Sequence, residues 1–310
     1  MYYIFGFLLV LLSASCFGIM GILAKYAYAA NITIGTLLFF RFFFAAVLFW
    51  SLILFKKIPF QLRFKQISIL FMMGTGGYAL MAILLFTSFS LLPVSLASTA
   101  YYLYPLFVMI LNSMFSKQLF EKSHSVSIIF SLLGLYFVLG ADFNQINIIG
   151  LMSSVGCAVL YSVYIILTEK IQGEINVYIS SAFVTSFASI SIFIFSMFRQ
   201  DFNLNFHASG WLSVLGISFF STFLAILTFA KGIERIGSSK AAQLSIFEPI
   251  ITVLFSYLLF HESLGRSQKF GIFLILLSAL LTNIGWKKIS LTNKHAKSIF
   301  YEETTRNIRK

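Results

Sequence analysis

Charged residues are scarce in this sequence, and acidic residues are scarcer than basic ones. Only 10% of the 310 residues are charged and ten of them are acidic, whereas 59% are hydrophobic. A soluble domain of this length would need a far larger polar surface. The sequence has only two cysteines, Cys16 and Cys157, and both lie within apolar runs, so we interpret them as small core residues.

The motifs of several enzyme and pump classes are missing as well. There is no Walker A sequence, which disfavours an ATP-driven pump, and there is neither H-E-x-x-H nor G-x-S-x-G nor a pair of aspartates within an apolar run. The histidines fall in predicted loops or in the C-terminal tail, so we predict no metal site, no histidine proton relay and no cofactor. The basic residues lie between apolar runs rather than in a stripe with aromatics, so no nucleic-acid partner is expected.

Long apolar runs recur along almost the whole chain. A bilayer-spanning helix needs about 20 apolar residues, and a lipid environment requires a backbone whose hydrogen bonds are satisfied internally. Alternation with a period of two is absent, so we predict helices, and the fold class is an all-α polytopic membrane protein with ten transmembrane helices. The predicted spans are 3–24, 34–55, 66–90, 94–116, 124–141, 148–168, 177–198, 211–230, 239–260 and 268–286.

The distribution of Lys and Arg predicts the orientation of these spans. If the N-terminus is cytoplasmic, 17 of the 22 basic residues lie on the cytoplasmic side and four lie on the other side, with Arg41 inside a span. Cytoplasmic loops carry an excess of Lys and Arg, so both termini are expected in the cytoplasm and the protein in the plasma (inner) membrane. The polar, basic tail is expected to lie against anionic lipid of the bilayer.

The two halves of the sequence match when one is shifted by 144 residues. The segment "STAYYLYPLFVMIL" (98–111) then falls on residues 242–255, and Pro105 falls on Pro249, which pairs two of only four prolines. Five predicted spans also fall on five without an insertion. Because five is odd, the second copy enters the membrane from the opposite face, which makes an inverted repeat of the kind found in secondary transporters. We predict repeats at 1–143 and 144–287 and a tail at 288–310.

Four segments resemble the ten-span members of the drug/metabolite transporter superfamily, which contain two EamA-type domains. These segments are "FFRFFFAAVLF" (39–49), "YLYPLFVMI" (102–110), "EPIITVLFSYLLFHESLG" (248–265) and "GIFLILLSALL" (271–281). The resemblance covers roughly residues 4–286. It implies alternating access to a central cavity lined mainly by spans 1, 3, 4, 6, 8 and 9.

Glu248 stands in the middle of the ninth span, next to Pro249. On a continuous helix Glu248 would share one face with Ser245 and Thr252, and the matching face of the fourth span would present Tyr101 and Tyr104. An acid within a span is a candidate functional residue. Desolvation disfavours the charged form of a carboxyl, so this side chain could hold and release a proton near neutral pH, which leaves proton coupling open. Alternatively, Glu248 bonds the backbone freed near the proline and fixes the bend.

Arg41 lies well inside the second predicted span, about eight residues from its start. Arginine keeps its charge, so Arg41 needs a carboxylate, carbonyl groups or water nearby. It could bind an anionic group of a solute, but we favour a structural role in tying the second span to a neighbour. Pro105 and Pro249 are likewise interpreted as structural residues that interrupt their helices.

Several polar and small residues inside other spans complete the candidate site. Tyrosine hydroxyls within spans seek partners, and a cavity lined by them suits small amphipathic solutes. The remaining candidates for solute binding are Tyr78, Tyr161, Tyr164 and Thr222. The glycines of "MGTGGY" (73–78) permit either close helix packing, which we favour, or a flexible gate.

These observations favour a secondary transporter of small metabolites, expected to be an exporter. The resemblance implies amino acids, amines, organic acids or drug-like solutes as the substrate classes. The alternatives are a membrane channel, for which the sequence offers no filter or ring of like residues, and a membrane-embedded enzyme. The oligomeric state is left open.

Overall fold

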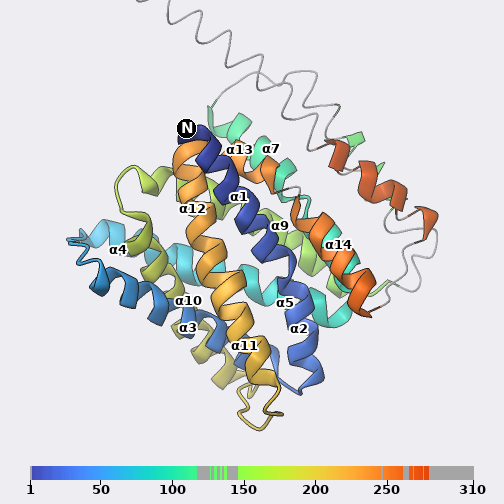
Figure 1. Ribbon diagram of the computed structural model, residues 1–310, viewed down its shortest axis with the longest axis horizontal. Coiled ribbons are helices and arrows are strands. Elements are labelled where there is room, and N and C mark those ends of the chain that lie inside the picture. The colour runs from blue at the N-terminus through green and yellow to red at the C-terminus, as the bar shows by residue number, and fades with distance from the viewer. Residues whose placement is uncertain are drawn as a thin grey trace, which may run out of the picture.

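The protein forms a bundle of helices whose outer surface is strongly apolar. In a computed structural model, the structure describes residues 2–116, 146–245 and 247–260, together with 126, 129–130, 133–134, 136–137, 265–267, 269–274 and 276–278; within them there is no strand (Figure 1). Phe55 and Phe198 are 89% and 85% exposed. Exposed apolar side chains on this scale require a nonaqueous surrounding such as lipid.

Seven helical segments of the described chain are long and apolar enough to cross a membrane, which confirms a multi-span helical protein. They are Tyr3–Ala29, Ile34–Phe55, Phe64–Leu91, Val94–Asn112, Ile148–Gln172, Val177–Phe198 and Gly210–Ile236. Two shorter apolar helices, Ile250–Phe260 and Lys269–Ser278, fall in the predicted ninth and tenth spans. Most of the predicted fifth span (124–141), the end of the tenth and the tail at 288–310 lie outside the described residues.

Many of these segments consist of two or three helical pieces. In the first half the elements are α1 (Tyr2–Gly18), α2 (Met20–Ala29), α3 (Ile34–Phe55), α4 (Phe64–Met72), the π-helical η1 (Met73–Ala79), α5 (Leu80–Leu91), α6 (Val94–Tyr101) and α7 (Tyr104–Ser116). In the second half they are α9 (Ile148–Gln172), α10 (Val177–Phe198), α11 (Gly210–Ser218), the π-helical η3 (Phe219–Leu224), α12 (Ala225–Ile236), α13 (Ser238–Leu244) and α14 (Phe247–Phe260).

Side-chain caps fix the starts of three spans at the predicted residues. The Thr33 side chain accepts a hydrogen bond from the first turn of α3, and Asn147 and Asn176 do the same for α9 and α10. These side chains satisfy backbone N–H groups that have no partner within the helix. Polar caps next to apolar runs therefore explain why the predicted starts at 34, 148 and 177 are correct.

Three spans extend further than predicted. The first continues from 24 to Ala29, the sixth from 168 to Gln172 and the eighth from 230 to Ile236. The prediction ended these spans near charged residues, but charge does not terminate a helix. Lys25, Lys231 and Arg235 lie inside helices, where long basic side chains can extend from the apolar region toward the interface.

Interruptions occur at matching positions in the two halves. α6 ends at Tyr101 and α7 begins at Tyr104, while α13 ends at Leu244 and α14 begins at Phe247. Under the shift of 144 residues these breaks coincide within one residue, and η1 and η3 coincide within about two residues. The correspondence extends the sequence repeat to local helix geometry, including π-helical turns, which are rare in proteins.

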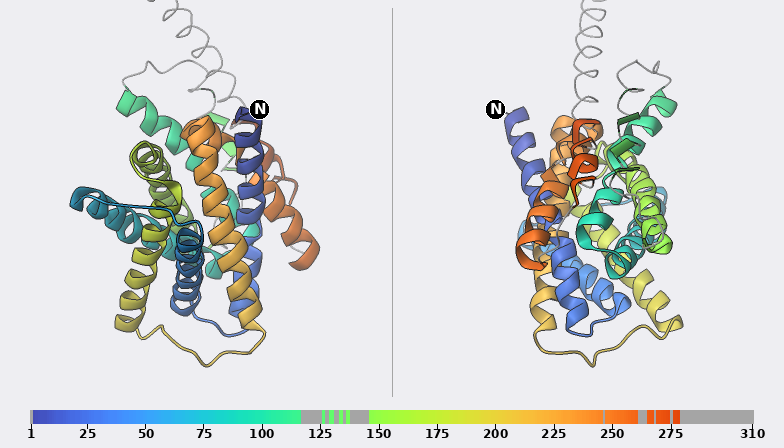
Figure 2. Two further views of the ribbon diagram at one scale, coloured as in Figure 1. Left: turned by 60° about the vertical axis from the view of Figure 1, so that its left-hand side comes forward. Right: turned by 90° about the vertical axis from the view of Figure 1, so that its right-hand side faces the viewer.

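The uninterrupted helices α3 and α10 lie antiparallel along each other, as Figures 1 and 2 show. Near the start of α3, the Gly35 amide donates to Asp201, which follows α10, over 2.9 Å. In the middle Trp50 Nε1 donates to Ser186 Oγ over 3.0 Å, and beyond the end of α3 Lys56 Nζ donates to the Tyr178 hydroxyl over 3.1 Å. The pair is thus held together at both ends and in the middle.

The helices α1 and α12 form a second close pair (Figure 1). Gly232 of α12 has no space for a side chain, because a Cβ atom there would overlap Val10 Cγ2. We expect Gly232→Val to force the helices apart and to leave little monodisperse protein in fluorescence-detected size-exclusion chromatography. Gly173→Ala is the matched control, because the nearest atom to its new Cβ is 3.8 Å away, and it should behave as wild type. A normal profile for Gly232→Val would contradict this packing.

Candidate functional site

Six tyrosines from three spans form one buried cluster in the middle of the bundle. Tyr78 comes from η1, three come from the break between α6 and α7, and two come from α9. The cluster consists of Tyr78, Tyr101, Tyr102, Tyr104, Tyr161 and Tyr164, all of them buried. The structure thus brings together the predicted tyrosines of spans 3, 4 and 6.

Ring contacts run through the whole tyrosine cluster. The ring centroids of Tyr104 and Tyr161 are 4.8 Å apart, and those of Tyr78 and Tyr164 are 4.9 Å apart. Tyr101 contacts Tyr104 at 5.2 Å and Tyr161 at 5.6 Å. Aromatic pairs at such distances attract one another and present ring edges and faces in defined directions.

One phenol group of the cluster lacks a hydrogen bond within the described part of the chain. The hydroxyl oxygen of Tyr102 is buried there without a partner. Leaving a buried polar group unpaired costs free energy, and such groups in native proteins usually serve a ligand or water. This hydroxyl is therefore available to a solute.

Glu248 lies beside this cluster, in the first turn of α14. It is only 5% exposed, and the tyrosines within electrostatic range of its carboxyl include Tyr101, Tyr102, Tyr104 and Tyr161. Among the described residues neither a cation nor a hydrogen-bond donor offsets the burial of the carboxyl. A lone buried carboxyl is stable when it is protonated or when it meets a cation.

The hydroxyls predicted to share the face of Glu248 are bonded to the backbone instead. The span breaks between α13 and α14, as the proline predicts, so Ser245 and Thr252 flank Glu248 in different helical pieces, and both are buried. Ser245 Oγ donates to the Ala241 carbonyl over 3.1 Å. Thr252 Oγ1 donates to the Gly18 carbonyl over 2.8 Å and so ties α14 to the bend between α1 and α2. Ser245 and Thr252 thus hold the backbone around Glu248.

Pro105 and Pro249 lie next to the two breaks, as the sequence predicts. Pro105 is the second residue of α7 and Pro249 is the third residue of α14. Proline is tolerated in the first turn of a helix, where its missing N–H would have no partner, but it disrupts the helix that precedes it. The prolines therefore explain why both spans restart here.

Arg41 is fully enclosed between α3 and the π-helical segment η3. It is 1% exposed, and its Nε donates to Thr222 Oγ1 over 2.8 Å. The guanidinium carbon lies 4.9 Å from the Phe42 ring centroid and 5.1 Å from that of Phe86, distances typical of cation–π contacts. Arg41 is also hydrogen-bonded to Tyr78, so it lies at the edge of the tyrosine cluster with Thr222 on its other side. These contacts tie the second span to the third and eighth spans, which favours the structural interpretation of Arg41.

Some residues at the site were not singled out from the sequence. Cys157 is fully buried and lies within electrostatic range of both Glu248 and Arg41. Ser154 Oγ donates to the Ala97 carbonyl over 2.9 Å and contacts Ser88 Oγ at 2.6 Å, which joins three spans. Ser154 and Cys157 lie on the same side of α9 as Tyr161, and that helical spacing could have found them.

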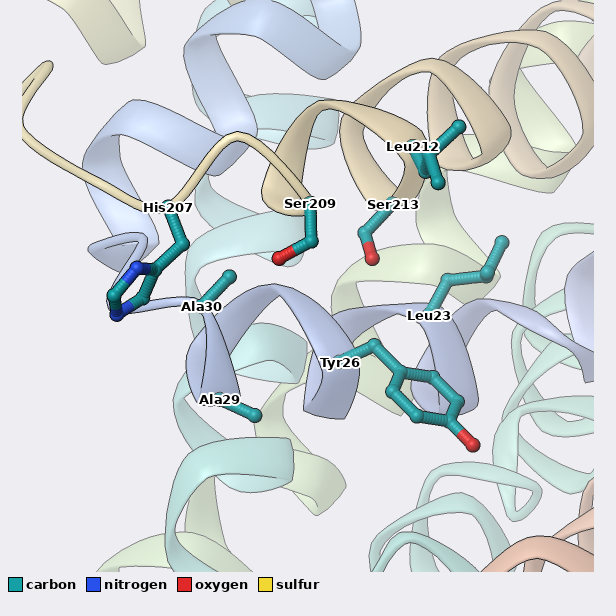
Figure 3. Close-up of a pocket in the computed structure, with 8 residues that line it drawn as sticks. All are labelled: Leu23, Tyr26, Ala29, Ala30, His207, Ser209, Leu212 and Ser213. Carbon is teal, nitrogen blue, oxygen red and sulfur yellow. The ribbon is translucent and has the colours of Figure 1, made fainter.

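Two cavities lie away from the cluster. One, of about 440 Å³, lies between α2 and α11 and is lined by Tyr26, His207 and Ser209 among others (Figure 3). The other, of about 430 Å³, is lined by the segment 172–178 with Lys231 and Glu234. No cluster tyrosine lines either cavity. Within the described residues no group of three or more His, Cys, Asp or Glu side chains could hold a metal ion.

Comparison with known proteins places this architecture among transporters. The model of the EamA-like transporter family matches residues 4–140 and 148–284. The chain is 24% identical to the uncharacterized transporter YcbK of Bacillus subtilis over 276 residues, which cover 86% of this chain and 88% of the relative. It is 26% identical to an uncharacterized transporter of Archaeoglobus fulgidus, covering 76% and 84% of the two chains. A solved crystal structure of a protein at 17% identity shares the fold, with a TM-score of 0.67 and coverage of 90% and 97%.

Proposed function

Because this chain belongs to the EamA-like transporter family, we propose that it is a secondary transporter that exports small amphipathic metabolites by alternating access. In this proposal ten spans form two inverted repeats, 1–143 and 144–287, followed by a cytoplasmic tail at 288–310. Both termini lie on the cytoplasmic side of the plasma (inner) membrane. The excess of Lys and Arg on that side supports the orientation, and the antiparallel packing of the equivalent helices α3 and α10 supports the inversion.

The observation that carries the proposal is the buried Glu248 beside the tyrosine cluster. A structural bundle has no use for a buried acid that, in the described part of the chain, has neither a cation nor a donor beside it, since a buried charge is costly. Both broken spans, α6–α7 and α13–α14, meet the site at their breaks. Interrupted helices are the elements from which many secondary transporters build their midplane sites. We therefore assign solute contact to Glu248 and the cluster tyrosines, and a supporting role to Ser245, Thr252 and Thr222.

The chemistry of the site favours solutes with a protonated amine. A carboxylate attracts a cation directly, and the faces of tyrosine rings attract cations through their quadrupole. Among amino acids, amines, organic acids and drug-like solutes, those that carry an ammonium group fit best. The apolar area of six rings would accommodate the rest of an amphipathic molecule.

The same carboxyl offers a mechanism for proton coupling. Glu248 can be neutralised either by a proton or by a cationic solute, but one carboxylate cannot be neutralised by both at once. Proton binding from the outside would release the solute there, and solute binding from the cytoplasm would displace the proton inward. Protons moving down their gradient would then drive export.

Metabolite profiling of cells tests the proposed function. Medium and cytosol are compared between cells that express the wild-type protein and cells with an empty vector. We expect at least one amine-bearing solute to accumulate in the medium only when the protein is present, and a protonophore should abolish this accumulation. Identical profiles, followed by identical uptake of the candidate solutes, would reject the proposal.

A further inference from the structure

A groove opens on the membrane-facing surface between η1 and α9. It has a volume of about 340 Å³, and its lining includes Met72, Gly76 and Gly77 from the third span and Leu160, Val163 and Tyr164 from the sixth. These residues lie near the middle of the spans Phe64–Leu91 and Ile148–Gln172. At that depth the groove opens toward lipid hydrocarbon. The part of a bound molecule that lies at the opening must therefore be apolar.

The groove exists because two of the residues that line it, Gly76 and Gly77, are glycines. A Cβ atom added to Gly76 would have no neighbour within 4 Å, and one added to Gly77 would contact only Tyr164, at 3.7 Å, and the Met72 carbonyl, at 3.9 Å. Gly74 differs, because its Cβ would lie 2.7 Å from the Phe187 Cβ of α10. We expected these glycines to allow close helix packing. This expectation is correct for Gly74 but wrong for Gly76.

The equivalent junction in the other repeat has larger side chains at the glycine positions. Under the shift of 144 residues, η1 against α9 corresponds to η3 against α1, and both pairs are in contact. There, Gly76 is replaced by Phe220 and Gly77 by Ser221. Ser221 Oγ donates to the Cys16 carbonyl over 2.7 Å and bonds η3 to α1. The repeat thus provides an internal comparison, in which a hydrogen bond joins the helices at one junction and glycines leave space at the other.

The floor of the groove is part of the tyrosine cluster. Tyr164 lines the groove, and its ring contacts those of Tyr78 at 4.9 Å and Tyr161 at 6.3 Å. Tyr161 in turn contacts Tyr104, which lies beside Glu248. Aromatic surface therefore continues from the bilayer to the carboxyl group.

We propose that this groove is a lateral portal through which the apolar part of an amphipathic solute passes between the bilayer and the tyrosine cluster. The proposal rests on the function proposed above and narrows its substrates to solutes that partition into the membrane. The solute keeps its apolar part in lipid until the tyrosine rings replace that lipid, so its transfer does not expose apolar surface to water. Its ammonium group reaches Glu248 last.

Photolabelling in liposomes tests the portal. The purified protein is reconstituted with 3-trifluoromethyl-3-phenyldiazirine, a small apolar probe that partitions into the bilayer, and labelled residues are mapped by mass spectrometry after irradiation. We expect labelling of Tyr164 and Tyr78 in the wild type and its loss in Gly76→Phe, which copies the residue found at the equivalent position, 220, of the other repeat. Leu80→Phe is the matched control, because Leu80 is exposed beside η1 but does not line the groove, and its labelling should equal that of the wild type.

Competition identifies the occupant of the groove. Decylammonium should suppress labelling of Tyr164 and Tyr78, whereas methylammonium, which has no apolar chain, should not. If decylammonium has no effect, a lipid acyl chain holds the groove and the proposal is wrong. Absence of labelling at both tyrosines in the wild type, or labelling unchanged by Gly76→Phe, would also overturn it. Labelling does not require net transport. The photolabelling experiment can therefore fail or succeed independently of the metabolite profiling that tests the proposed function.

Discussion

Replacing Glu248 by glutamine is expected to reduce solute export to the level of empty-vector cells. Glutamine has nearly the same shape, but it can neither attract an ammonium group as an anion nor exchange a proton. Because Glu248 is buried without a cation or a hydrogen-bond donor among the described residues, its neutral replacement should not destabilise the fold. The measurement is export of the solute found by metabolite profiling, at matched amounts of protein in the membrane.

The control for this prediction is Glu234→Gln, the same chemical change on α12 in the cavity away from the cluster. It should export as the wild type does. Glu248→Asp retains the charge on a shorter side chain and should retain part of the activity. Full activity of Glu248→Gln with normal abundance would reduce Glu248 to a role in helix geometry and would remove the proposed exchange of proton and solute.

Replacing Thr222 by valine is expected to destabilise the protein by about 1.5–3 kcal/mol. Valine preserves the shape of threonine but removes the acceptor of the Arg41 Nε–H, which then remains buried without that partner. Thr222→Ser retains the acceptor and should lie close to the wild type. The measurement is the midpoint of thermal unfolding in detergent, followed by fluorescence-detected size-exclusion chromatography.

A double variant separates the structural role of Arg41 from a role in solute binding. In Arg41→Met/Thr222→Val both members of the Arg41–Thr222 hydrogen bond are replaced by apolar side chains, which removes the buried unpaired donor although Tyr78 also loses its bond to Arg41. We expect the double variant to be more stable than Thr222→Val alone and to keep its export activity. If stability returns but export is lost, Arg41 acts on the solute and the structural interpretation is wrong.

Span limits could be predicted where apolar runs meet polar caps. The second and seventh spans, 34–55 and 177–198, coincide with α3 and α10, because Thr33 and Asn176 cap their starts and both runs lack breaks. The predicted span limits were wrong where helices continue through charged residues, as at Lys231 and Arg235. A hydrophobicity pattern locates the bilayer, whereas helix ends depend on backbone partners that the pattern does not contain.

The sequence could identify the tyrosines as candidate site residues, but it could not predict that they come together in one cluster. Helical spacing selected Tyr161 with Tyr164 and Tyr101 with Tyr104, since each pair lies on one helix face or across one break. Their convergence with Tyr78 depends on the packing of three spans, which no local pattern encodes. Arg41 donates a hydrogen bond to Thr222, which lies 181 residues away in the sequence. The π-helical geometry of η1 and η3 likewise has no signal in the sequence that we could identify.

The antiparallel pair α3 and α10 has a consequence for observing transport. Both helices are unbroken over 22 residues and are held together at the ends and in the middle, whereas three of the spans at the site, the third, fourth and ninth, are divided into shorter helices. Spectroscopic labels on α3 and α10 should therefore keep a constant separation in every conformation. The distance between these two helices can serve as a fixed reference when movements of the interrupted spans are measured.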